Sequence, residues 1–243
     1  MLGRRAARFA ALGEPVRLQL VDHLTYGDAS PGELASATGL ATNLLAFHLG
    51  TLEEAGIIRR VRSEGDKRRT YVQLRWDDPS VATLVEASAA GTHPPAPARL
   101  PRVVFVCTHN SARSQLAAAR WAQVSSIPAT SAGTHPAERV HPRTLAAARR
   151  HRLALRSPRT RLVEDTVQAG DVLVAVCDNA HEELSALTID RPLTRPAGAV
   201  GRGWLHWAIP DPAAADTDEA FETAYADIDH RVARLAHALE VTA

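Results

Sequence analysis

Two short apolar runs, each leading into a cysteine, dominate the pattern of the second half of the chain. Residues 103–106 precede Cys107, and residues 172–176 precede Cys177. Continuous apolar runs of this length that are rich in valine predict strands buried on both faces of a sheet. An Ala-rich run over residues 116–121 follows the first of them and predicts a helix. Strands that alternate with helices predict an α/β fold with a doubly wound parallel sheet.

The first part of the chain instead shows apolar positions at helical spacing, with clear helix boundaries. An amphipathic helix is expected over residues 1–13, and Pro15 predicts the start of a second helix. Residues 30–33 (Ser-Pro-Gly-Glu) form a capping box with proline at the first helical position, and Gly39 predicts where that short helix ends. A further helix is expected over residues 42–55. Two helices joined by a short turn that contains glycine are typical of a helix-turn-helix.

A basic β-hairpin follows these helices. It is expected over residues 57–74, with a tight turn at residues 63–66. Residues 57–75 carry seven Lys or Arg against two Asp or Glu, whereas residues 1–90 as a whole carry 11 of each. The positive charge of this unit is therefore concentrated on one hairpin, as contact with DNA phosphates requires. The net charge of the whole chain is only +1, so bulk electrostatics identifies no partner.

These features together resemble the winged helix-turn-helix of the ArsR family of bacterial repressors. The resemblance covers about residues 1–76 and rests on residues 11–18, 32–35 and 48–58. It implies a homodimer that binds double-stranded DNA, with the helix from Thr42 in the major groove and the Arg-rich wing on the backbone. The residues expected at the DNA are Thr42, Asn43, Phe47 and His48 on the helix, and Arg59, Arg60, Arg62, Lys67, Arg68 and Arg69 on the wing.

Two features set this unit apart from the usual pattern of that family. It contains no cysteine, which excludes arsenite sensing by a cysteine cluster. The expected recognition helix is also apolar for a helix that reads bases, although Asn43 could read adenine. A helix-turn-helix retained only as a dimerisation module therefore stands beside DNA binding as an alternative.

A proline-rich stretch divides the chain. Residues 91–101 predict a semi-rigid linker between one unit at residues 1–90 and another at residues 102–243. The chain has two cysteines far apart in sequence, which argues against a disulfide scaffold and indicates a reducing compartment, the cytoplasm. No apolar run is long enough to span a membrane, and the 11 histidines show no metal-ligand pattern. We therefore expect neither membrane contact nor a bound metal.

The strongest chemical motif is Cys107 with an arginine six positions later. Cys107 and Arg113 enclose five residues between a predicted strand and a predicted helix. The backbone N–H groups of such a loop point inward, and the helix adds the positive end of its dipole, so that an oxyanion and a thiolate are both favoured. Arg113 offers a planar fork to two oxygens of a tetrahedral anion, and Ser114 can donate to the Cys107 sulfur. The alternative is a free core cysteine beside a surface arginine.

Two more residues are candidates for the same site. Ligands of a doubly wound sheet lie beyond the carboxyl ends of its strands, where both cysteines are expected. Cys177 is thus either a second reactive thiol or a buried, inert one. Asp211 stands between Pro210 and Pro212, which predicts a stiff loop that enters neither a helix nor a sheet. A rigid acidic loop suits a general acid.

The second unit resembles the low-molecular-weight protein tyrosine phosphatases and the arsenate reductases built on the same fold. The resemblance spans about residues 102–240 and rests on residues 106–115, 131–134, 177–179 and 211–212. It implies that Cys107 is the nucleophile, that Arg113 is the transition-state clamp and that Asp211 is the general acid. The oxyanion loop implied by the resemblance comprises Thr108, His109, Asn110, Ser111, Ala112 and Arg113.

Several positions favour the reductase branch of this family. His109 and Asn110 lean towards it, and Ala112 stands where the phosphatase branch usually has a second cysteine. The chain has only Cys107 and Cys177, so the complete three-cysteine relay of the thioredoxin-coupled reductases is absent. We therefore expect a DNA-binding transcriptional regulator fused to a thiol-dependent arsenate reductase. We expect no bound cofactor, and an external small thiol or redoxin as the reductant.

Two other functions fit the same residues. The first is a phosphatase that acts on phosphotyrosine or a small phosphate ester, because attack of the Cys107 thiolate on the oxyanion is common to both enzymes. The second is a transcription factor without catalytic activity, whose second unit senses an oxyanion or a redox state. The sequence also leaves open whether the two units communicate.

Overall fold

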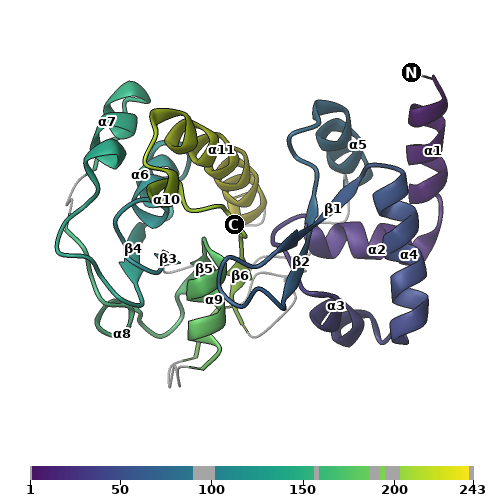
Figure 1. The fold of residues 1–243 in the computed structure, drawn as a ribbon, viewed down its shortest axis with the longest axis horizontal. Coiled ribbons are helices and arrows are strands. Elements are labelled where there is room, and N and C mark those ends of the chain that lie inside the picture. The colour runs from purple at the N-terminus through teal and green to yellow at the C-terminus, as the bar shows by residue number, and fades with distance from the viewer. Residues whose placement is uncertain (1, 90–101, 156–158, 187–191, 195–202, 241–243) are drawn as a thin grey trace.

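The computed structural model describes residues 2–89, 102–155, 159–186, 192–194 and 203–240, which form two units lying side by side (Figure 1). The sequence predicted a linker over residues 91–101, which lies outside the described residues. The basic hairpin of the N-terminal unit reaches across to the C-terminal unit (Figure 1). The contact between the units is therefore part of the fold, and it bears directly on the candidate site.

The N-terminal unit has the predicted helices and hairpin. Its elements are α1 (Leu2–Leu12), α2 (Pro15–Leu24), α3 (Pro31–Thr38), α4 (Thr42–Glu54), β1 (Ile58–Arg62), β2 (Thr70–Leu74) and α5 (Pro79–Ala89). The capping box is confirmed, because the Ser30 side chain accepts from the Glu33 N–H and the Glu33 carboxylate accepts from the Ser30 N–H. Gly39 ends α3 with a φ of 70°, a left-handed conformation that glycine adopts without strain.

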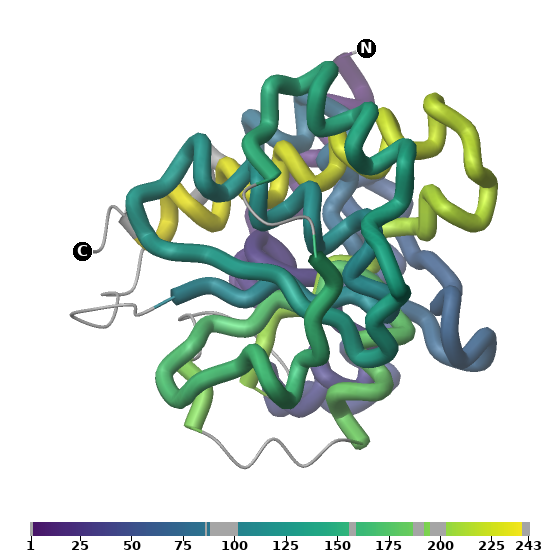
Figure 2. The backbone as a smooth tube through the Cα atoms, turned by 90° about the vertical axis from the view of Figure 1, so that its left-hand side faces the viewer, coloured from purple at the N-terminus to yellow at the C-terminus, as the bar shows by residue number. Residues whose placement is uncertain are grey.

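The C-terminal unit is a doubly wound parallel sheet, as the sequence predicted. Its strands are β3 (Val103–Cys107), β4 (Ala129–Gly133), β5 (Val172–Ala175) and β6 (Leu205–His206), in the spatial order β4-β3-β5-β6. The helices are α6 (Arg113–Val124), α7 (Pro142–Arg150), α8 (Val163–Thr166), α9 (Asp178–Leu184), α10 (Pro212–Ala215) and α11 (Asp218–Glu240). Helices α6, α7 and α11 cover one face, and α8 and α9 lie on the other (Figures 1 and 2).

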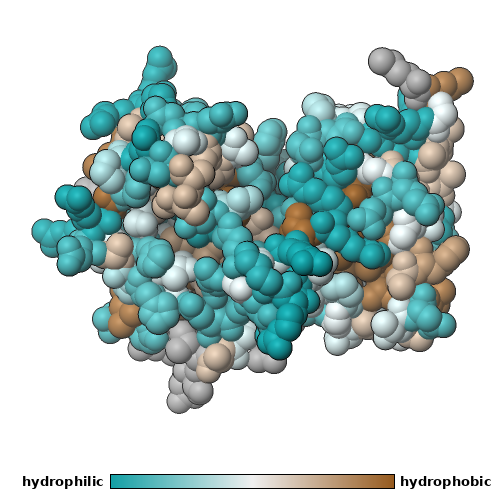
Figure 3. All heavy atoms as spheres, in the orientation of Figure 1, coloured by the Kyte–Doolittle hydropathy of each residue, from teal (hydrophilic) through white to brown (hydrophobic). Residues whose placement is uncertain are grey.

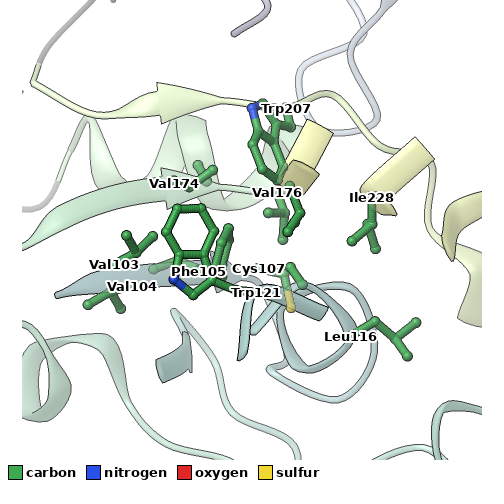
Figure 4. Packing of buried hydrophobic residues seen from close by; sticks show 14 of the residues in the cluster. Val103, Val104, Phe105, Cys107, Leu116, Trp121, Val174, Val176, Trp207 and Ile228 are labelled. Atoms are coloured by element: carbon green, nitrogen blue, oxygen red, sulfur yellow. The ribbon is translucent and has the colours of Figure 1, made fainter. Parts of the chain in front are cut away.

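The order of the strands places both cysteines at the same edge of the sheet, the one formed by the carboxyl ends of its strands. Strand β3 is central, and Val106 pairs with Ala175 of β5, so the two strands end together. Apolar side chains of β3, β5 and α6 pack around Phe105 and Trp121 beneath this edge (Figure 4). Phe105 and Trp121 are completely buried. The core therefore fixes where Cys107 leaves the sheet.

The prediction for the loop around Asp211 was wrong in one respect. Pro212 begins the short helix α10, and Asp211 is its N-cap residue, whose side chain accepts from the Ala213 N–H at 3.4 Å. Proline is compatible with the first position of a helix because the N–H that it lacks has no partner there. The loop is stiff for this reason rather than because it avoids helical structure.

A buried polar contact joins the two units. Asp28, which is 0% exposed at its side chain, forms an ion pair with Arg231 of α11 at 3.1 Å. Asp28 also accepts from Gln73 of β2 at 2.8 Å, and the Trp207 indole N–H donates to the Tyr26 carbonyl at 2.9 Å. Because these polar atoms are buried and paired, the two units have a defined relative position.

The exposed surface differs between the two ends of the molecule. Leu2 and Phe9 of α1 and Leu44 and Phe47 of α4 are large apolar side chains that remain exposed. Apolar surface of this kind is visible on the side of the N-terminal unit in Figure 3. Among the described helices, none combines the length and the apolar character needed to cross a membrane.

Candidate functional site

The loop between β3 and α6 turns its carbonyl groups outward. The carbonyl oxygens of five consecutive residues accept hydrogen bonds from the surrounding chain at 2.8–3.2 Å: those of Cys107, Thr108, His109, Asn110 and Ser111. A trans peptide unit is planar and directs its N–H away from its C=O. The N–H groups of residues 108–112 therefore point to the centre of the loop, an arrangement that suits an anion.

Strand β4 approaches this loop very closely at Gly133. A Cβ atom at this position would lie 2.6 Å from the Thr108 carbonyl oxygen and 2.9 Å from the Asn110 nitrogen. Residues after β4 then donate three of the hydrogen bonds that hold the loop, from Thr134, His135 and Ala137. Glycine at position 133 is thus what allows the outer chain to hold the loop in shape.

A chain of hydrogen bonds leads to the Cys107 sulfur. Asn110 has a φ of 49°, and its Oδ1 accepts from the Arg161 N–H at 2.9 Å, which leaves its Nδ2 as a donor. That nitrogen donates to the Ser114 hydroxyl oxygen at 2.9 Å. The Ser114 oxygen lies 3.0 Å from the Cys107 sulfur, and its own proton is free to be donated there. The Ser114 hydroxyl is thus placed to donate to the Cys107 sulfur.

Arg113 is a buried cation at the start of α6. It is 3% exposed, and its Nη1 donates to the Ile209 carbonyl at 2.7 Å and to the Glu64 carboxylate at 2.9 Å. Its Nη2 lies 3.2 Å from Asp211 Oδ1. Burial alone would lower the pKa of Arg113, but the neighbouring thiols and the two carboxylates raise it. Arg113 therefore keeps its charge, and in this structure both of its terminal nitrogens contact a carboxylate.

The first turn of α6 adds donors to the same place. Ala112 is its N-cap residue and provides no side-chain acceptor for the first N–H groups of the helix. Those groups and the helix dipole together favour an anion in front of them. The 12-residue helix thus supports the loop electrostatically as well as mechanically.

Cys177 lies next to the loop but is fully enclosed. It is 0% exposed, its sulfur accepts from the Ala180 N–H at 3.4 Å, and it lies 3.6 Å from the Thr108 hydroxyl oxygen. Burial raises the pKa of Cys177 to about 11, although the charge of Arg113 opposes this shift. Cys177 is therefore a neutral thiol at neutral pH, separated from solvent and adjacent to the loop between β3 and α6.

The remaining predicted residues of the loop differ in exposure. Asn110 is 0% exposed and Thr108 is nearly buried, whereas the His109 side chain is exposed to solvent. Among the described residues, no group of three or more His, Cys, Asp or Glu side chains is arranged to hold a metal ion.

The residues predicted to contact DNA are divided between an exposed face and the core. Thr42, Asn43 and Phe47 lie on the exposed face of α4. His48 faces inward instead, is 6% exposed and lies with its Nδ1 3.5 Å from the Glu14 carboxylate. His48 points inward because the helical period puts it on the same face as the buried leucine Leu45.

The basic side chains of the wing are exposed but partly paired. Arg59 pairs with Asp77 and Arg60 with Glu53, at 3.3 and 3.4 Å. Arg68 pairs with Asp66 at 2.9 Å, and its side chain is 91% exposed. Of the six predicted basic residues, Arg59 is of intermediate exposure, and the exposed ones are Arg60, Arg62, Lys67, Arg68 and Arg69. Exposed ion pairs are weak, so these side chains can exchange one anionic partner for another.

Sequence reasoning missed the contribution of the wing to this site. Glu64, in the turn of the hairpin, accepts from the Asp211 N–H at 2.5 Å with one oxygen and binds Arg113 with the other. The only available signal was an acidic residue within a basic hairpin. A cleft of about 950 Å³ opens beside this contact and is lined by Glu64 and Arg62 of the wing and by Asp211.

Comparisons with known proteins match two separate parts of the chain. Residues 102–242 match the low molecular weight phosphotyrosine protein phosphatase family, and residues 12–61 match a helix-turn-helix domain. The N-terminal unit is similar to the biofilm growth-associated repressor of Xylella fastidiosa, with 37% identity over 78 residues. That match takes in 31% of this chain and spans 62% of the length of the repressor.

The chain is also similar to solved structures. One is an arsenate reductase from Archaeoglobus fulgidus, with 30% identity, 56% of this chain and 98% of that chain covered, and a TM-score of 0.43. Another is the tyrosine phosphatase Wzb from Escherichia coli K30 in complex with sulphate, with 18% identity, coverage of 57% and 98%, and a TM-score of 0.44. The family match takes in more than half of the sequence and includes every residue of the oxyanion loop. The chain therefore belongs to the low molecular weight phosphotyrosine protein phosphatase family, with a helix-turn-helix domain joined to its N-terminal side.

Proposed function

We propose that this chain is a DNA-binding regulator whose C-terminal unit reduces arsenate with thiols. The observation that carries the enzymatic part is the loop of inward N–H groups around Cys107, closed by the buried cation of Arg113. Such a seat recognises a tetrahedral oxyanion and stabilises the negative charge that develops on it during displacement.

The reaction begins with attack on the bound anion. The Cys107 thiolate forms a bond to arsenic, and an oxygen leaves as water after it takes a proton from Asp211. A second thiolate then attacks the Cys107 sulfur. The sulfur–arsenic bond breaks, its electron pair passes to arsenic, and arsenite and a disulfide are formed. Two thiols are thus oxidised while As(V) is reduced to As(III).

Cys177 provides a second thiol beside the loop, but it is buried and neutral at neutral pH, so it must become exposed before it can attack the Cys107 sulfur. Its sulfur lies 3.6 Å from the hydroxyl oxygen of Thr108, a residue of the loop. A small external thiol is the other candidate for this role. The wing also favours a small substrate over a phosphorylated protein. Glu64 of the wing contacts Arg113 and occupies space that the side chain of a protein substrate would need.

Steady-state assays of arsenite production test the enzymatic part. We expect turnover with a small thiol or a redoxin as donor, and none for Cys107→Ser. The absence of arsenite with every donor would contradict the reductase assignment. Thiol-independent hydrolysis of an aryl phosphate that is lost in Cys107→Ser would instead identify a phosphatase, an alternative that the contact between Asp211 and Arg113 favours equally.

The DNA-binding part rests on α4 and the wing. The exposed face of α4 carries Thr42 and Asn43, and the hairpin concentrates the basic side chains. Phe9 of α1 is 54% exposed and supports an interface between two copies in a homodimer. Binding of a DNA duplex that weakens linearly with the logarithm of salt concentration would support this assignment. Binding that is absent even at low salt would leave the helix-turn-helix as an association module.

A further inference from the structure

The tip of the wing, residues 63–66, is bound by the catalytic unit. The Glu64 N–H donates to Asp178 Oδ2 at 2.8 Å, and the Asp66 N–H donates to Glu182 Oε2 at 2.9 Å. The Ser63 hydroxyl donates to the other oxygen of Glu182 at 2.6 Å, and Ser63 is 0% exposed. Both acceptors are carboxylates of α9, so a helix of the enzyme holds the turn of the DNA-binding hairpin.

The fit at the tip is close. A Cβ atom at Gly65 would lie 2.5 Å from Asn179 Oδ1 and 2.7 Å from Glu182 Oε2. The φ of Gly65 lies outside the left-handed region, so the hairpin by itself would accept a larger residue here. A side chain at position 65 would therefore displace the ends of the Asn179 and Glu182 side chains, which hold the tip.

The same turn reaches the catalytic residues. One oxygen of Glu64 holds the backbone N–H of Asp211, and the other holds Arg113 Nη1. The Glu64 side chain is 27% exposed, whereas that of Arg113 is 4% exposed. A side chain from the DNA-binding unit thus helps to position both the clamp and the general-acid loop.

The groups that bind α9 are of the kind that bind DNA. Backbone N–H groups and serine hydroxyls are common partners of DNA phosphates, and here the carboxylates of Asp178 and Glu182 occupy them. A hydrogen-bond donor cannot be shared fully between a carboxylate and a phosphate. We propose that the wing tip is an intramolecular ligand of the catalytic unit, and that its docking there and its contact with DNA exclude one another.

This exclusion links the two units. A ligand that stabilises the docked wing weakens DNA binding, and by thermodynamic reciprocity DNA weakens the binding of that ligand by the same factor. DNA binding also withdraws Glu64 from Arg113 and Asp211. The inference rests on the DNA-binding part of the proposed function and is independent of which reaction the enzyme catalyses.

Two variants of the full chain release the wing in different ways. Gly65→Leu blocks docking by its size without changing charge, and Glu182→Gln weakens the acceptor of Ser63 and Asp66. We expect each to increase affinity for a mixed-sequence DNA duplex by about tenfold, because a hydrogen bond to a charged group contributes roughly this much. Glu183→Gln is the matched control: it removes the same charge at the next residue, which contacts Thr134 instead, and should leave affinity unchanged.

A variant of the catalytic site tests the link from the other side. Arg113→Lys keeps the positive charge but loses the geometry that holds Glu64 and Ile209 together. We expect it to increase DNA affinity, whereas Cys107→Ser, which changes the same site without touching the wing, should not. Equal DNA affinity of the native chain, Gly65→Leu and Arg113→Lys would overturn the exclusion.

Amide hydrogen exchange tests docking without DNA. The N–H groups of Glu64 and Asp66 should be protected in the native chain and in Glu183→Gln, and should exchange faster in Gly65→Leu and Glu182→Gln. Unprotected amides in the native chain would overturn docking itself. Protected amides together with no DNA binding by any variant would overturn the DNA-binding function and, with it, the exclusion.

Discussion

At the scale of single residues, the site depends on which atom of each side chain donates. The Arg161 N–H fixes the orientation of the Asn110 amide, and this makes Ser114 an acceptor from Asn110 and a donor to Cys107. The types of residue in this series of hydrogen bonds were predictable from the motif. The direction of these hydrogen bonds was not predictable, because Arg161, which sets it, lies 51 residues away in sequence from Asn110.

Ser114→Ala should slow the first half-reaction by about tenfold, because one hydrogen bond to a charged sulfur is lost. The rate of arsenite formation in a single turnover, at saturating thiol, measures this effect. Ser111→Ala is a suitable control, because the Ser111 contacts to the outer chain use its backbone carbonyl. Equal rates for the native chain and Ser114→Ala would show that the hydrogen bond from Ser114 to the Cys107 sulfur does not assist the reaction.

Cys177 should make stability fall at alkaline pH. Burial raises its pKa from 9.0 to about 11, so between these values the unfolded chain releases a proton that the folded chain retains. The free energy of unfolding should therefore decrease more steeply in the native chain than in Cys177→Ala across that interval. Denaturant titrations at a series of pH values measure the difference, and parallel curves for the two proteins would contradict burial of the thiol.

At the scale of elements, local signals explain most of what the sequence predicted correctly. The capping box, the Gly39 cap and the apolar strands act within a few residues, so α3 and β3 were recognisable without tertiary contacts. The start of α10 was missed, because Asp-Pro has the same sequence signature in a turn and at an N-cap. The inward position of His48 was also missed, since His48 was expected to contact DNA from the recognition helix.

Strand β4 approaches the oxyanion loop closely at Gly133, and a substitution there tests whether the loop depends on this approach. Gly133→Val should weaken binding of inorganic phosphate by at least about tenfold, because its Cβ would overlap the Thr108 carbonyl and overpacking costs roughly 1–3 kcal/mol. Isothermal titration calorimetry measures the binding. Gly50→Ala serves as a control, because no atom lies within 4 Å of a Cβ placed there. Unchanged phosphate binding by Gly133→Val would show that the loop does not need the close approach.

At the scale of the whole molecule, the two units are held together by buried polar contacts. The residues that join them, such as Asp28, Gln73 and Arg231, show no pattern in the sequence, because each is polar and finds a partner in the other unit, which for Gln73 is the Ala208 carbonyl. The role of Glu64 could not be predicted for the same reason. A motif read within one unit cannot reveal a side chain that another unit supplies.

Asp28→Asn should destabilise the chain by about 1.5–3 kcal/mol, because the buried Arg231 loses one of its two carboxylate partners and keeps the other, Asp227. Denaturant unfolding followed by tryptophan fluorescence measures the loss. Asp77→Asn is the control, since its partner Arg59 is exposed and surface ion pairs contribute little. Similar unfolding curves for the two variants would show that the contact between the units contributes little to stability.

The central claim is that Cys107, held in a seat of backbone N–H groups, forms a covalent bond with arsenate. A single-turnover experiment with the full chain, arsenate and a small thiol tests it most directly. We predict one arsenite for each oxidised pair of thiols in the native chain, and no arsenite from Cys107→Ser even though that variant still binds arsenate. Arsenite formed at the same rate by both proteins would contradict the account.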